Sequence, residues 1–175
     1  MTRYAAFLRG VNLGKRTVKS AELKAAFEAM GFTDVKTLLA SGNVLFDSKG
    51  ARGLKAKIES GLEAAFGFSV GTVVRPLDAL KAMVASDPFA GMIESEAAKL
   101  HVMLFDEVVP AKLKPKGIEG DFDVATVGSH DIYFIFHRKP DGTYLGGSDF
   151  ALEKELPKGT LVTMRNWNTI LTAIA

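Results

Sequence analysis

The order of apolar patterns in the first 76 residues constrains the fold of this chain more than any other feature. Two segments carry apolar residues at helical spacing, and Gly31 and Gly67 follow them where a helix typically ends. Four short apolar or β-branched runs alternate with these helices, at residues 4–9, 35–40, 43–47 and 70–75. This β-α-β-β-α-β order predicts an α+β fold, in which a ferredoxin-like N-terminal half places two helices on one face of a four-stranded antiparallel sheet.

The two helices are identified by their apolar side chains. Ser20 is the expected N-cap of the first helix, and Pro76 is expected to open a further short helix after the fourth strand. Ser41 and Gly42 are expected to form a tight turn between the second and third strands. The apolar positions of the first two helices are Leu23, Ala26, Phe27 and Met30, and then Leu54, Ile58, Leu62, Ala65 and Phe66.

The second half begins at Asp87-Pro88-Phe89, because proline biases the residue before it away from helix. We therefore expect a ferredoxin-like α/β-plait subdomain at residues 1–86 and a second, smaller α+β subdomain packed on it at residues 87–175. Residues 109–116 predict a short helix or turn, and Asp149 is expected to cap a short helix that runs through residue 156. Trp167 begins the apolar pattern of a closing helix. The strands of this half are expected at residues 100–105, 122–127, 132–137 and 161–164.

Composition narrows the class of protein. The chain is 47% hydrophobic and 24% charged, which is typical of a globular protein with a real core. It has no cysteine, which excludes disulfides and thiolate chemistry. The N-terminus lacks the apolar run of a signal peptide, and no stretch is long enough for a membrane helix, so we expect a cytoplasmic protein without a membrane partner.

A basic, glycine-containing loop follows the first strand and is the main candidate binding site. Residues 1–20 hold five cations and no acid, whereas the whole chain carries only +2. Glycine and asparagine allow a sharp bend there, and the free N–H groups of the next helix add positive dipole, so the loop suits a phosphate or carboxylate. The candidate residues of this loop are Arg9, Gly10, Asn12, Gly14, Lys15 and Arg16.

The loop does not match the Walker A pattern. Only three residues separate Gly10 from Gly14, and Arg16 stands where that motif has Ser or Thr. The alternative interpretation is that the glycines shape a surface loop whose cations are solvated.

Two further segments are candidates for the same chemistry. In the expected topology the turn at Ser41, Gly42 and Asn43 lies at the sheet edge where the basic loop begins. Arg165 lies near a helix N-terminus, where the dipole disfavours a cation, so either an internal carboxylate or a bound anion should hold it. Asn166 is expected to cap that helix and is a further candidate ligand contact, while Trp167 is expected in the core.

Three functional hypotheses follow from these residues. The first is a binding module for a phosphate-containing small molecule, nucleotide or nucleic acid. The second is an enzyme of acid–base or transferase type, although His101, His130 and His137 show no metal-ligand spacing, and the cofactor and catalytic residues stay unknown. The third is a protein-interaction module. An RNA-stacking surface is disfavoured because alternation places Tyr4 and Phe7 on opposite faces of a strand.

Four motifs together resemble a known family. The segments FLRGVNLG at 7–14, ASGNVLF at 40–46, DPF at 87–89 and TMRNWNT at 163–169 are similar to the bacterial domain of unknown function 1697 family. The resemblance spans nearly the whole chain and implies two α+β subdomains, of which the first is ferredoxin-like. It implies no activity. The departures from the family pattern are Leu13, Lys15, Ala40 and Met164.

Overall fold

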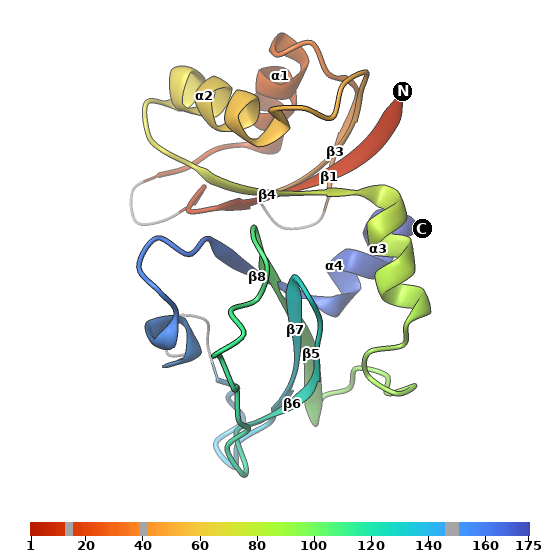
Figure 1. Ribbon diagram of the computed structural model, residues 1–175, viewed down its shortest axis with the longest axis vertical. Helices are drawn as coiled ribbons and strands as arrows, with labels where there is room; N and C mark the ends of the chain where they lie inside the picture. Colours follow the sequence, from red (N-terminus) through yellow and green to blue (C-terminus); the bar gives the residue numbers. More distant parts are fainter. Residues whose placement is uncertain (13–15, 39–41, 146–150) are drawn as a thin grey trace. The chain divides into compact units, whose positions relative to one another are not determined.

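The computed structural model describes residues 1–12, 16–38, 42–145 and 151–175 (Figure 1). The chain divides into two compact units, which we call the first unit (Met1–Ala82 with Leu171–Ala175) and the second unit (Met83–Ile170). Two four-stranded antiparallel sheets and four α-helices are present in the described residues. The α+β class expected from the sequence is therefore confirmed. No helix among the residues described is long and apolar enough to cross a membrane.

The first sheet has β1 at its centre. β1 pairs antiparallel with β3 on one edge and with β4 on the other, and the strand order is β2-β3-β1-β4. The order of elements along the chain is the β-α-β-β-α-β order that the sequence predicted, followed by α3. The elements are β1 (Thr2–Arg9), α1 (Ser20–Ala29), β2 (Thr33–Thr37), β3 (Asn43–Ser48), α2 (Leu54–Phe66), β4 (Gly71–Pro76) and α3 (Leu77–Ala85).

Helices α1 and α2 lie over one face of this sheet (Figure 1). Their buried side chains recur at helical spacing, so each helix presents one apolar stripe to the strands. The centre of the resulting core is aromatic: the Phe46 ring lies 5.4 Å from that of Phe27 and 4.6 Å from that of Phe32. The helix residues buried in this core are Leu23, Phe27, Leu54, Ile58 and Leu62.

Two local predictions in the first unit were wrong. Lys19, not Ser20, is the N-cap of α1, and its backbone N–H donates to the Glu22 carboxylate at 3.0 Å. β2 covers Thr33–Thr37 instead of residues 35–40. Its pairing with β3 shifts register between Thr33 and Lys36, and Asp34 has a φ of 47°, so the simple alternation used to place the strand does not hold there.

The second sheet repeats the strand order of the first. Its order is β6-β7-β5-β8, with β5 at the centre as β1 is in the first sheet. The expected hairpin at residues 128–131 is present, and the Gly128 N–H donates to the Asp131 carbonyl at 2.7 Å. The elements are β5 (Ala98–Phe105), β6 (Phe122–Val127), β7 (Asp131–His137), a 3₁₀ helix η1 (Ala151–Glu155), β8 (Val162–Asn166) and α4 (Trp167–Ile174).

The connections of the second sheet differ from those of the first. Residues 106–121 contain turns but no helix, so the turn alternative applies at 109–116, where Pro110 and Pro115 remove backbone donors. The expected short helix near residue 150 is a 3₁₀ helix, and Asp149 lies outside the described residues. The two sheets therefore share a strand order but differ in the segments that connect their strands.

Replacing the buried side chain of Ile58 tests the packing of α2. Ile58 is 0% exposed, so we expect Ile58→Ala to lower the free energy of unfolding by about 2–5 kcal/mol through lost burial and a residual cavity. Glu63→Ala on the exposed side of α2 is the matched control and should change stability by less than about 0.5 kcal/mol. Urea unfolding measures both; equal effects would contradict the assigned helix face.

Candidate functional site

The basic loop begins directly after β1 and is shaped by Gly10 and Asn12. Gly10 has a φ of 79°, which favours glycine. The Asn12 side-chain oxygen accepts a hydrogen bond from the Val18 N–H at 2.8 Å, so this amide ties the two ends of the loop together. Gly14 and Lys15 lie outside the described residues.

Arg16 is held against the loop by two contacts. Its Nη1 donates to the Gly10 carbonyl at 3.4 Å, and its guanidinium carbon lies 4.5 Å from the centre of the Phe68 ring. Within the described part of the chain, no carboxylate is recorded in ion-pair contact with Arg16. A planar cation that stacks on an aromatic ring keeps a defined orientation and retains donors for a further partner.

The turn at residues 42–43 lies beside the start of this loop. The Leu8 N–H donates to the Gly42 carbonyl at 2.8 Å, and Phe7 is paired with Asn43 across the β1–β3 ladder. Asn43 is 3% exposed, and its Nδ2 donates to the Leu38 carbonyl at 3.4 Å. The two segments thus converge, with Asn43 in a structural contact; Ser41 lies outside the described residues.

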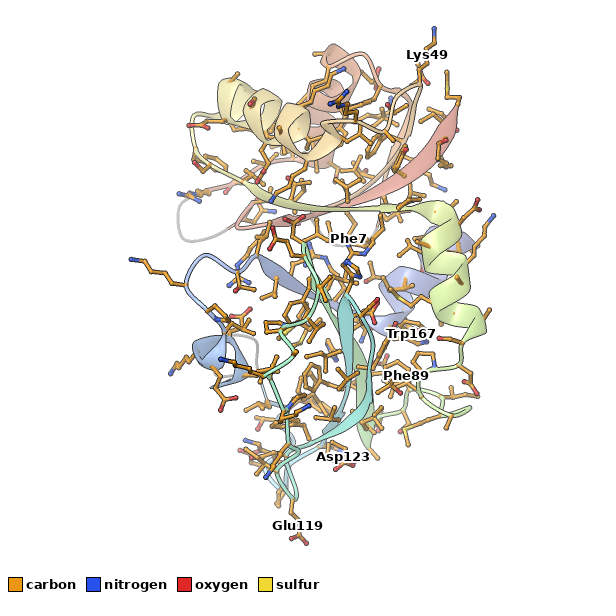
Figure 2. The ribbon with its side chains drawn as sticks, in the orientation of Figure 1. Phe7, Lys49, Phe89, Glu119, Asp123 and Trp167 are labelled. Atoms are coloured by element: carbon orange, nitrogen blue, oxygen red, sulfur yellow. The ribbon has the colours of Figure 1, made fainter. Side chains whose placement is uncertain are left out.

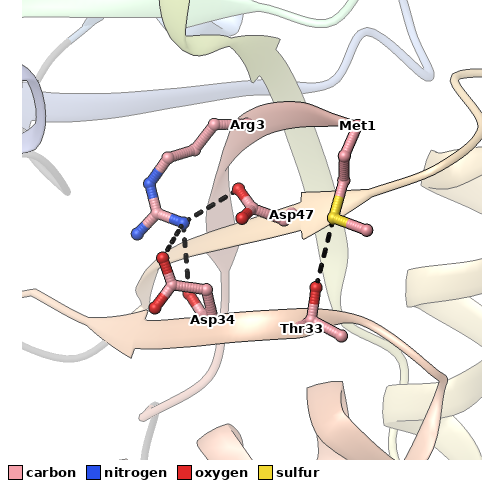
Figure 3. A network of polar contacts seen from close by, with 5 residues as sticks. All are labelled: Met1, Arg3, Thr33, Asp34 and Asp47. Carbon is pink, nitrogen blue, oxygen red and sulfur yellow. Dashed lines mark hydrogen bonds and ion pairs between the residues drawn. The ribbon is translucent and has the colours of Figure 1, made fainter.

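The opposite end of β1 carries an internally neutralised cation. Arg3 lies 3.0 Å from the carboxylates of both Asp34 and Asp47, and nearby the Thr33 hydroxyl donates to the Met1 sulfur at 3.4 Å (Figure 3). Asp34 and Asp47 belong to β2 and β3, so this network joins three neighbouring strands. The positive charge of Arg3 is therefore not part of the basic loop.

The Arg165 segment belongs to the second unit, whereas the basic loop belongs to the first. Arg165 Nη1 donates to the Thr163 hydroxyl at 2.6 Å and to the Met164 carbonyl at 2.9 Å. Asn166 caps α4 as expected: its Oδ1 accepts the Asn168 N–H at 2.8 Å. These contacts give both side chains a role in shaping the junction of β8 and α4.

Trp167 lies in the core of the second unit, as the sequence predicted. Its ring centre lies 5.2 Å from that of Phe89 and 5.8 Å from that of Tyr133, and Figure 2 shows Phe89 and Trp167 side by side. Both contacts are edge-on, the arrangement that aromatic quadrupoles favour. The DPF segment is thereby packed against the start of α4.

A carboxylate that the sequence did not single out organises the asparagines of the last motif. Glu94 Oε1 accepts from the Leu100 N–H at 3.0 Å and from Asn166 Nδ2 at 2.7 Å, while its Oε2 accepts from Asn168 Nδ2 at 2.9 Å. Glu94 and the two asparagines are more than 70 residues apart in sequence, and no local pattern signals such a contact.

Two of the histidines, His101 and His137, occupy different settings. His101 Nδ1 is buried without a recorded hydrogen-bond partner, and the ring meets Phe136 edge-on at 5.0 Å. His137 Nε2 lies 2.7 Å from an Asp123 carboxylate oxygen near the surface. Among the residues that the structure describes, no group of three or more His, Asp or Glu could hold a metal ion.

The fold and these contacts describe a mixed α+β protein of two units with a basic loop at the end of its first strand. The chain belongs to the family described as Protein of unknown function (DUF1697), whose model matches residues 1–133. A search of curated proteins gives no match. The conserved bacterial protein SP0830 from Streptococcus pneumoniae shares the fold, with a TM-score of 0.73 at 23% identity over 99% of this chain and 96% of that one.

Glu94 is expected to stabilise the second unit through its three recorded hydrogen bonds. Glu94→Ala leaves the Asn166 amide and the Leu100 N–H without this acceptor, and we expect a loss of about 1–3 kcal/mol in the free energy of unfolding. Glu96→Ala is the control, because the hydrogen bond recorded for Glu96 among the described residues is made by its backbone carbonyl, which accepts from the Tyr144 hydroxyl. Denaturant unfolding of the three chains measures the difference, and a smaller loss for Glu94→Ala than for the control would contradict the assigned role.

His101 is expected to make stability fall at mildly acidic pH. Burial lowers the pKa of His101 below its ordinary value of 6.5, and the charge of Glu94 opposes this shift only in part. Below that value the unfolded chain binds the proton more readily than the folded chain, so the free energy of unfolding decreases as pH falls through 6.5 toward the lowered pKa.

The matched variant for this pH effect is His101→Phe, which keeps a ring against Phe136 and removes the titrating group. Urea unfolding between pH 8 and 5 should show a smaller decrease for this variant than for the native chain. Identical pH profiles for the two chains would overturn the assignment.

Proposed function

We propose that the first unit is a binding module for a small phosphate-bearing anion, either a nucleotide or a nucleic-acid phosphate, at the loop formed by residues 9–16. The observation that carries this proposal is the placement of Arg16, whose guanidinium is stacked on Phe68 and bonded to Gly10 beside the end of β1. A cation that is already oriented loses less conformational entropy when it binds an anion. This argues against the alternative in which the loop cations are merely solvated.

In this proposal some of the remaining candidate residues add positive charge to the loop and others hold its backbone in place. Arg9 adds charge at the start of the loop, whereas Gly14, Lys15 and Ser41, which the sequence also predicts as ligand contacts, lie outside the described residues. Asn12, Gly42 and Asn43 hold the two segments in register through backbone and side-chain hydrogen bonds. Their part is therefore to position the loop, not to contact the ligand.

We also propose that the first unit is a ferredoxin-like α/β plait and that the subdomains divide near residues 86 and 87. The strand order β2-β3-β1-β4 and the placement of α1 and α2 on one sheet face support the first point. The end of α3 at Ala85 supports the second, whereas the compact units divide after Ala82 and place Leu171–Ala175 with the first unit.

An enzymatic role is the second candidate, and one contact favours it. The His137–Asp123 pair has the separation of a hydrogen-bonded acid–base dyad at 2.7 Å. Both side chains are exposed to solvent, at 37% and 61%. This pair is weaker support than the oriented Arg16. A protein-interaction role has no single contact that favours it.

Substitution of Arg16 tests the proposed anion site. We expect Arg16→Ala to weaken the binding of pyrophosphate, ATP or a short single-stranded RNA by about tenfold or more, because a hydrogen bond to a charged group contributes about 1.5–3 kcal/mol. Isothermal titration calorimetry at two salt concentrations measures the affinities. Arg16→Lys keeps the charge but loses the planar group that stacks on Phe68. Its affinity should therefore fall between that of the native chain and that of Arg16→Ala.

Arg52→Ala is the matched control, because it removes the same charge from an exposed residue of the first unit away from the loop. Equal losses in the Arg16 and Arg52 variants would indicate general electrostatics instead of a site. No binding of any of the three probes to the native chain would reject the proposal.

A further inference from the structure

The two sheets share a strand order, but their corresponding connections are built differently. In the first unit the connections β1–β2 and β3–β4 form α1 and α2, and both pack on the core face of the sheet. In the second unit the connections β5–β6 and β7–β8 also contribute to the core, through Val109 and Leu152. They do so with irregular chain and the 3₁₀ helix η1 (Figure 1).

A cavity lies where the connecting segments of the second sheet differ from those of the first. A hollow of about 410 Å³ lies among residues of these two connections and the start of β6. That volume is in the range of pockets that hold small molecules. An amphipathic α-helix covers a sheet face with a continuous row of side chains, whereas here the hollow lies among residues of turns and of a five-residue 3₁₀ helix.

The cavity has an apolar side made by four residues. Phe122 and Leu152 are buried, whereas Ile118 is 52% exposed although it lines the hollow. Leu145 completes this side. The apolar surface would favour a hydrocarbon or aryl group, since covering it would remove it from water.

The charged lining of the cavity favours an anion. Lys114 and Lys116 are both exposed, and among the residues described here no partner is recorded for either. Of the two acids in the lining, Asp121 is paired with Lys139 at 3.3 Å, which leaves Glu155 as the acid without a recorded ion pair. Two lysines on one segment therefore outweigh one carboxylate on η1.

We propose that this cavity in the second unit binds a small amphipathic anion, with its apolar body against Phe122, Leu145 and Leu152 and its carboxylate or other acidic head at Lys114 and Lys116. The apolar side of the cavity would contact the hydrocarbon or aryl end of such a molecule, and the two lysines would contact its acidic end. The site is independent of the anion site proposed for the first unit, which uses other residues and another chemistry.

A methyl-resolved NMR titration of the full chain with octanoate tests this site. We expect saturable shift changes at the methyl groups of Ile118, Leu145 and Leu152. The double variant Lys114→Ala, Lys116→Ala should bind octanoate about tenfold more weakly, because it removes both cations of the lining that would attract the carboxylate. Lys112→Ala, which removes a nearby charge outside the lining, should bind as the native chain does.

Two further probes distinguish binding of the acidic head from binding of the apolar tail: octanol, which is uncharged, and octylamine, whose charge is positive. Octanol should bind more weakly than octanoate to the native chain, and about equally to the native chain and the double variant. Octylamine should bind most weakly. Ile118→Ser should weaken the binding of octanoate and octanol together, because it removes apolar lining at a side chain that is 52% exposed.

Three outcomes would overturn the proposal. The first is no saturable shift with octanoate. The second is shifts that spread equally to exposed apolar residues outside the cavity, such as Met92 and Val108. The third is octylamine binding as tightly as octanoate. The octanoate titration is read on residues of the second unit, whereas the Arg16 test concerns the first unit. A negative result in either experiment therefore leaves the other proposal unaffected.

Discussion

The structure of the first unit depends on the central strand β1, which is hydrogen-bonded on both edges. Its ladders to β3 and β4 cover most of its length, and the side chains of both its faces are buried, with Ala6 at 0% and Phe7 at 1% exposure. A strand held in this way cannot slip in register without breaking both ladders and the packing of its side chains on both faces. Because β1 is fixed, its C-terminal end is fixed too, and the loop that follows starts beside Gly42.

Burial on both faces also bears on the kind of partner this unit could take. Single-stranded RNA is recognised on sheets by exposed aromatic rings. Tyr4 is buried against Phe46 at a ring distance of 5.7 Å, and Phe7 is buried as well, so β1 offers no such surface. A ligand of this unit would have to be held at the loop, by charge and backbone donors.

Several asparagines of the family motifs stabilise loops, turns and a helix end. Asn12 closes the basic loop, Asn43 bonds the Leu38 carbonyl, and Asn166 caps α4 while its amide meets Glu94. These amides satisfy backbone groups where strands end and the main-chain ladder stops, which is where backbone N–H and C=O groups would otherwise lack partners. Residues that look like ligand contacts in a motif can therefore owe their identity to backbone geometry.

The sequence by itself determined the class, the order of the elements and most of their bounds, because helical and alternating apolar periods are local and report directly on which face is buried. It also located the hairpin at residues 128–131 and the α4 cap at Asn166, since turn and cap residues act within a few positions. Only the tertiary structure decided the strand register, the stack of Arg16 on Phe68, the contacts of Glu94 with Asn166 and Asn168, and the cavity under η1. Each of these joins residues far apart in the chain, and such contacts depend on how sheets and connections pack, which no local pattern encodes.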